Sequence, residues 1–101
     1  MAYDSKFRGN DVDLLFDAIL NLENKEECYR FFEDLCTIKE IKSLSQRFEV
    51  ATLLDEDKKY NEIEAATGAS TATISRINKC LVYGADGYKL ILERLKSKSE
   101  E

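Results

Sequence analysis

The sequence predicts an all-α protein. Proline is absent from its 101 residues, so the residue type that most strongly breaks helices is missing. Apolar residues recur at spacings of three and four, which is the period of a helix with one buried face. Alternation of apolar and polar residues, typical of strands, is hard to find. We therefore expect about six helices joined by short turns.

The first two helices are expected at residues 10–22 and 24–35. Asn10 is the expected N-cap of the first helix, because asparagine is a residue type that caps the starts of helices. The second helix has Phe31, Phe32 and Leu35 as its apolar content. The apolar stripe of the first helix consists of Val12, Leu15, Ile19 and Leu22.

A capping box predicts the start of a third helix at Ile38. Thr37 is followed three residues later by Glu40, so each side chain can bond the backbone N–H of the other residue. The helix is expected to stop in the charged turn DEDKK at residues 55–59. Its apolar face consists of Ile41, Leu44, Phe48, Ala51 and Leu54.

Two short helices are expected next, and together they predict a helix-turn-helix at about residues 60–81. The first covers residues 60–67, turns Ile63 and Ala66 inward, and ends at Gly68, where a left-handed residue is favoured. The second begins after Ser70, and a three-residue turn with glycine first is typical of this motif. One face of the second helix carries Ile74, Ile77 and Leu81, and the other carries Ala72, Arg76 and Lys79.

A last helix follows the glycine-marked bend YGADG, with Tyr88, Ile91, Leu92 and Leu95 on one stripe. The charged end KSKSEE is expected to fray. This gives one all-helical domain over residues 10–96, a flexible N-terminus at 1–9 and a flexible tail at 97–101.

The composition argues against an enzyme. Histidine is absent, which removes the commonest general base and the commonest metal ligand. The four glycines do not form a phosphate-binding loop, and the three cysteines form no CxxC pair and are expected to be reduced. We expect no cofactor and no metal. Without a targeting segment or an apolar stretch of about 20 residues, a soluble cytoplasmic protein is expected.

The start of the fifth helix is rich in small polar residues. Four of the eight residues 70–77 are Ser or Thr, which are poor helix-interior residues. Short side chains let the first turn of a helix approach base edges closely, and its free N–H groups can meet phosphate. The alternative is a helix pair packed in a core with its Ser and Thr simply exposed. Because the net charge is −5, a DNA-binding surface has to be local.

Residues 35–81 resemble the Trp repressor superfamily. TIKEIKSLSQRFEVATLL resembles its third helix, and YNEIEAATGASTATISRINKCL resembles its DNA-reading unit, with a gap of about one residue near Asp57. With NKCLVYGADGYKLIL added, the sequence is similar to the smaller YerC/YecD branch of proposed regulators. Residues 1–23 match only as an amphipathic helix.

The resemblance implies an intertwined homodimer that binds a palindromic operator in double-stranded DNA, with recognition helices about 34–36 Å apart. A dimer would also supply apolar surface that so short a chain lacks. One matching position, Glu64, places a carboxylate where the family has a cation, and this costs affinity if it faces phosphate. Exposed surface charge is the alternative for Arg76 and Lys79, and an N-cap for Asn61. The implied DNA-facing set is Tyr60, Asn61, Glu64, Ser70, Thr71, Ala72, Thr73 and Ser75, to which Arg76 and Lys79 are added.

Half of the family's tryptophan pocket is present. Arg47 and Arg76 match its two arginines, and Thr37 and Thr73 match two threonines. The alternative for Arg47 is an ion pair on its own helix. The remaining positions depart from the family, because a glycine becomes Ile77, a serine becomes Cys80, and leucines of the partner chain become Asp34 and Cys36. Since Ile77 would fill space left by glycine, we expect tryptophan not to be the effector.

The sequence thus predicts a homodimeric DNA-binding transcriptional regulator, a repressor that acts by occupying a promoter. The alternative is an acidic helical module that binds a protein and no DNA.

Overall fold

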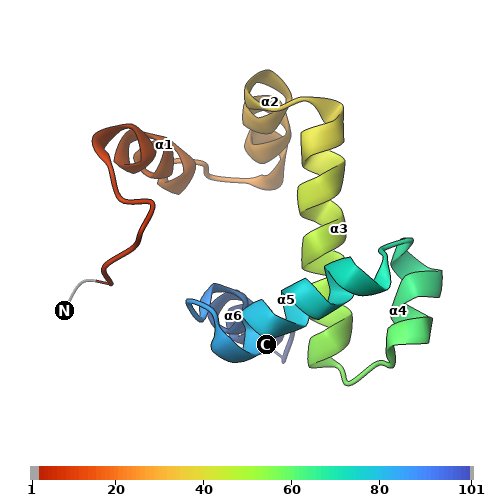
Figure 1. Cartoon of the computed structure of the whole chain (residues 1–101). Helices are drawn as coiled ribbons and strands as arrows, with labels where there is room; N and C mark the ends of the chain where they lie inside the picture. Colours follow the sequence, from red (N-terminus) through yellow and green to blue (C-terminus); the bar gives the residue numbers. More distant parts are fainter. Residues whose placement is uncertain (1–2, 101) are drawn as a thin grey trace. The chain divides into compact units, whose positions relative to one another are not determined.

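The structure, a computed structural model, describes residues 3–100 and contains helices and no strand within that range. The chain divides into two compact units, Met1–Thr37 and Ile38–Glu101. The expected domain at residues 10–96 spans both. The helices, shown in Figure 1, are α1 (Asn10–Leu20), α2 (Lys25–Leu35), α3 (Ile38–Asp55), α4 (Tyr60–Thr67), α5 (Thr71–Tyr83) and α6 (Gly87–Glu100).

The N-terminal unit contains α1 and α2. Gly9, and not Asn10 as expected, is the N-cap of α1, because its carbonyl accepts the N–H of Asp13 at 2.9 Å. The helix ends at Leu20, two residues before the predicted end. Asn21 ends it by donating its side-chain N–H to the carbonyl of Asp17 at 2.8 Å.

Asn24 is the N-cap of α2, which begins close to the predicted position. Its side chain accepts the N–H of Glu27 at 2.9 Å, and the Glu27 carboxylate accepts the N–H of Glu23 at 2.9 Å. Although both helices carry apolar stripes, none of their residues is buried. The large apolar side chains of this unit are therefore half-buried or exposed.

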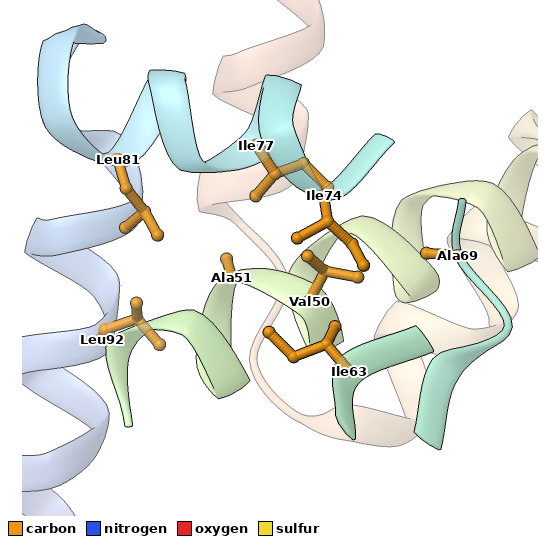
Figure 2. Close-up of a cluster of buried hydrophobic side chains, with 8 residues drawn as sticks. All are labelled: Val50, Ala51, Ile63, Ala69, Ile74, Ile77, Leu81 and Leu92. Atoms are coloured by element: carbon orange, nitrogen blue, oxygen red, sulfur yellow. The ribbon is translucent and has the colours of Figure 1, made fainter. Parts of the chain in front are cut away.

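The C-terminal unit has its core around the second half of α3. Helices α4, α5 and α6 each contact α3, and α5 also contacts α4 and α6. Phe48 and Tyr88, from α3 and α6, stack beside this core with ring centroids 6.4 Å apart. Figure 2 shows the buried cluster of Val50, Ala51, Ile63, Ala69, Ile74, Ile77, Leu81 and Leu92.

One inward residue of α4 was predicted wrongly. Ile63 is fully buried as expected, but Ala66 is exposed. Thr67, one turn after Ile63, takes the inner position and donates its hydroxyl to the carbonyl of Ile63 at 2.8 Å. Ala69 is buried instead of Ala66, because the chain reverses direction at the preceding residue.

The turn between α4 and α5 is fixed by hydrogen bonds. Gly68 has φ 74°, the left-handed conformation that was predicted, and donates its N–H to the carbonyl of Glu64 at 2.9 Å. The N–H of Ala69 donates to the Thr67 hydroxyl at 3.1 Å, and Gln46 of α3 donates to the Thr67 carbonyl at 3.1 Å. These bonds set the direction in which α5 leaves the turn.

Helix α6 is longer than expected. It continues to Glu100, so the described part of the segment 97–101 is helical where a flexible tail was expected. Lys96 Nζ lies 2.6 Å from a carboxylate oxygen of Asp55 at the end of α3. This hydrogen bond, and the negative charge of Asp55, raise the pKa of Lys96.

The bend before α6 gives a stability prediction. A Cβ added at Gly84 would lie 2.2 Å from the carbonyl oxygen of Cys80, whereas one added at Gly87 would meet no atom within 4 Å. We expect Gly84→Ala to lower the free energy of unfolding by about 1–3 kcal/mol, as overpacking does. Gly87→Ala, the matched control, should leave it unchanged or raise it by up to about 1 kcal/mol. Urea unfolding followed by circular dichroism measures both, and equal effects would contradict the prediction.

Candidate nucleic-acid interface

Ser70 starts α5 with a side-chain cap. Its hydroxyl oxygen accepts the N–H of Thr73 at 3.2 Å, and its hydroxyl donates to Thr73 Oγ1 at 3.1 Å. The local sequence produces this start because a serine N-cap satisfies an N–H that the helix itself leaves free. Thr73 is half-buried, so its side chain serves the helix start more than the surface.

Helix α5 has two faces, as the spacing of its residues predicted. Ile74 is fully buried, and Ile77 and Leu81 are nearly so. The outer face is exposed, and its first three residues, Thr71, Ala72 and Ser75, have small side chains. No long side chain therefore projects from the N-terminal end of this face. The exposed members of the predicted DNA-facing set on this helix are Thr71, Ala72, Ser75, Arg76 and Lys79.

Helix α4 contributes the other predicted residues. Tyr60 is half-buried and packs against the core cluster, so part of its role is structural. Asn61 is exposed. It is not the N-cap, because Lys59 occupies that position and donates its N–H to the Glu62 carboxylate at 3.1 Å.

Glu64 is tied to the first residue of α5. The hydroxyl of Thr71 donates a short hydrogen bond to Glu64 Oε1. Both residues are exposed. The carboxylate is therefore held on the outer surface of the helix-turn-helix, beside the leading end of α5.

The charge of the chain is unevenly distributed. Residues 58–83, which contain the helix-turn-helix, carry four cations and two carboxylates, a net charge of +2. Residues 10–35, which contain α1 and α2, carry a net charge of −6. The acidic balance of the whole chain thus comes mainly from the N-terminal helices. The positive balance of residues 58–83 comes from Lys58 and Lys59 just before α4, because residues 60–81 carry two cations and two carboxylates.

A polar pocket of about 240 Å³ opens between α3, α5 and α6. It brings together Arg47, Arg76 and Thr73, three of the four predicted effector residues. The fourth, Thr37, belongs to the N-terminal unit. Within residues 3–100 Arg47 makes no ion pair within 4.0 Å, contrary to the alternative considered for it. The other lining residues are Ser43, Gln46, Ile77, Cys80 and Tyr88.

Sequence reasoning missed Ser43, Gln46 and Tyr88 in this pocket. Ser43 lies four residues before Arg47, so helical spacing could have placed the two on one face. No local signal points to Tyr88, because α6 comes from a distant part of the chain. Burial raises the pKa of Tyr88, as does the nearby Cys80, while the positive charge of Arg47 lowers it.

Other kinds of site have little support in the described part of the chain. No group of three His, Cys, Asp or Glu side chains that could hold a metal ion occurs among the described residues. Cys28, Cys36 and Cys80 are free thiols. None of the helices in residues 3–100 has the length and apolar character needed to cross a membrane.

The paired short helices, the glycine turn and the exposed outer face of α5 define a helix-turn-helix protein. A family model described as Trp repressor protein matches residues 10–96. The chain is 57% identical over 96 residues to YerC of Bacillus subtilis (strain 168), described as uncharacterized, which covers 95% of this chain and 92% of the relative. The chain belongs to the Trp repressor family, and this membership suggests a DNA-binding regulator.

Two solved structures are also similar. A TrpR-like protein from Eubacterium eligens is 57% identical with a TM-score of 0.87, and the match covers 90% of this chain and 94% of that chain. A Staphylococcus aureus protein proposed to be a Trp repressor is 56% identical with a TM-score of 0.86, covering 90% and 91%. The expected resemblance and the all-α fold are thereby confirmed.

The pocket gives a prediction on pH. Because the pKa of Tyr88 is raised above its ordinary value of 10.0, its stabilising effect is fully present below pH 10 and is lost as the pH rises through the folded-state pKa. We expect the titration followed at 295 nm, taken as wild type minus Tyr88→Phe, to have a midpoint above 10. A difference curve with its midpoint at or below 10 would contradict this assignment.

Proposed function

We propose that this protein is a sequence-specific transcriptional regulator that binds double-stranded DNA as a homodimer. Helix α5 would enter the major groove, and two copies would read the halves of a palindromic operator. Because such a dimer can block a promoter by occupancy alone, we propose that it represses transcription.

The observation that carries this proposal is the exposure of the outer face of α5. Its leading end presents Thr71, Ala72 and Ser75, which are small enough for a close approach to base edges. Arg76 and Lys79 follow on the same exposed surface, and both can contact phosphates. The net charge of +2 over residues 58–83 supports such contacts in a chain that is acidic elsewhere.

The unburied apolar residues of α1 support the homodimer. Leu14 and Leu20 are 71% and 81% exposed. The stripe residues Val12, Leu15 and Ile19 are only half-buried, although a helix normally buries its apolar stripe. In the C-terminal unit, an apolar hollow of about 430 Å³ lined by residues such as Phe48 and Ile91 is also uncovered. A second copy of the chain would cover such surfaces.

We also propose that tryptophan is not the effector. Ile77 is 3% exposed and belongs to the core, so it cannot swing away from the arginine pair to admit an indole ring. Cys80 lines the pocket where the family has a serine, and a thiol donates a weaker hydrogen bond than a hydroxyl.

One observation favours the alternative of a protein-interaction module. The N-terminal unit combines a net charge of −6 over residues 10–35 with exposed apolar side chains. Such a surface could hold a basic protein partner in place of a second copy. The salt dependence of DNA binding separates this alternative from the regulator.

The regulator proposal predicts steeply salt-dependent DNA binding. Fluorescence anisotropy with duplexes selected from the genome should show log K falling with log salt by about 0.9 per phosphate contact. Titration at high duplex concentration should end at two chains per site. Weak binding that does not change with salt would contradict the proposal and favour the interaction module.

Lys79 supplies the matched test within this measurement. Lys79→Gln should weaken binding to all sequences about equally and reduce the salt slope by about 1 per chain. Lys89→Gln on α6 removes the same charge outside the candidate interface and should leave the slope unchanged. Equal effects of the two variants would argue against a phosphate contact at Lys79.

The proposal that tryptophan is not the effector predicts that isothermal titration calorimetry with tryptophan yields no saturable heat. No binding is expected because Ile77 fills the space that an indole ring would need, and the ring would have to displace this core side chain. Trp repressor-type binding in the micromolar range would refute it. Anisotropy with and without tryptophan is the accompanying control, and the operator affinity should not change.

A further inference from the structure

Glu64 is an unusual residue for a DNA-facing surface because its charge is not compensated. Its side chain is exposed on α4, and no ion pair within 4.0 Å involves it in residues 3–100. If this carboxylate faced phosphate, it would repel the DNA backbone. A carboxylate that faced phosphate would therefore weaken DNA binding, whereas one that faced a hydrogen-bond donor of a base would strengthen it.

The structure fixes where the carboxylate lies. Thr71 Oγ1 donates to Glu64 Oε1, and the carbonyl of Glu64 accepts the N–H of Gly68 at 2.9 Å. The residue is thus joined through its side chain to the first residue of α5 and through its backbone to the turn. Oε2 makes no hydrogen bond within residues 3–100 and remains available as an acceptor.

The same contact occupies the hydroxyl proton of Thr71. A threonine hydroxyl has a single proton, and here that proton goes to Glu64. Thr71 therefore cannot donate to a phosphate or a base while the contact lasts. Its role is to hold the carboxylate beside the part of α5 that would come closest to the base edges.

The chemistry of the major groove selects one base. Cytosine presents the N4 amino donor, whereas adenine presents the N6 donor beside the N7 acceptor, which repels a carboxylate. Guanine presents acceptors only, and thymine an acceptor and a methyl group. A carboxylate held at this edge therefore favours cytosine.

We propose that Glu64 is a specificity-determining residue that accepts a hydrogen bond from the N4 amino group of a cytosine in each half-site, with Thr71 as its positioning residue. This inference rests on the proposed function, because it requires α5 to enter the major groove.

Selection from a random duplex library, with wild type and Glu64→Gln in parallel, tests this inference. The wild type should select cytosine at one position of each half-site. Glu64→Gln should select adenine there, because an amide can bond N6 and N7 together. Its affinity for the wild-type site should fall about 10- to 150-fold, the equivalent of one hydrogen bond to a charged group.

Three further variants separate base reading from other effects. Glu93→Gln, on the exposed surface of α6, removes the same charge and should keep the wild-type preference. Thr71→Val removes the hydroxyl and should weaken the preference for cytosine, whereas Thr71→Ser should retain it. Circular dichroism should show that all variants are folded, as expected for exposed positions.

Three outcomes would overturn the inference. If Glu64→Gln binds every sequence more tightly and with a steeper salt slope, the carboxylate faces phosphate. If the wild type selects a sequence and Glu64→Gln selects the same one, the inference fails and the proposed function stands. If the wild type selects no sequence, the proposed function fails and the inference fails with it.

Discussion

The structure depends on the packing of Ile63 and Ile74 against Val50. All three side chains are fully buried, and they come from α4, α5 and α3. Burying each contributes roughly 1.5–3 kcal/mol, which is large beside the total stability of about 5–15 kcal/mol of a typical protein. Because the isoleucines take the inner sides of α4 and α5, the small residues of α5 must face outward. The packing of the core thus creates the candidate DNA-binding surface.

The direction of α5 has a second, polar determinant. Gln46 of α3 donates to the Thr67 carbonyl, and the left-handed Gly68 turns the chain directly afterwards. The hydrogen bonds satisfy backbone groups that the end of α4 leaves free. Helix α5 is therefore held from both its apolar face and its N-terminal turn, which is the rigidity that the proposed reading of bases would require.

The N-terminal unit has the opposite character. Helix α2 has a side-chain N-cap at Asn24 and α1 begins at Gly9 without one, and none of their residues is buried. Caps and propensity can define where a helix lies along the chain, while stability comes mainly from tertiary packing. The unit therefore has apolar side chains that the proposed homodimer would cover.

The sequence by itself determined where the two short helices of the C-terminal unit lie, since α4 covers residues 60–67 and α5 begins after Ser70 as predicted. Caps, glycines and apolar spacing act within a few residues, so they can be read along the chain. Only the tertiary structure decided that Ala69 is buried in place of Ala66, that Tyr88 joins Arg47 and Arg76 in one pocket, and that Thr71 holds Glu64. Each of these depends on where two separate elements meet, and local spacing does not encode that.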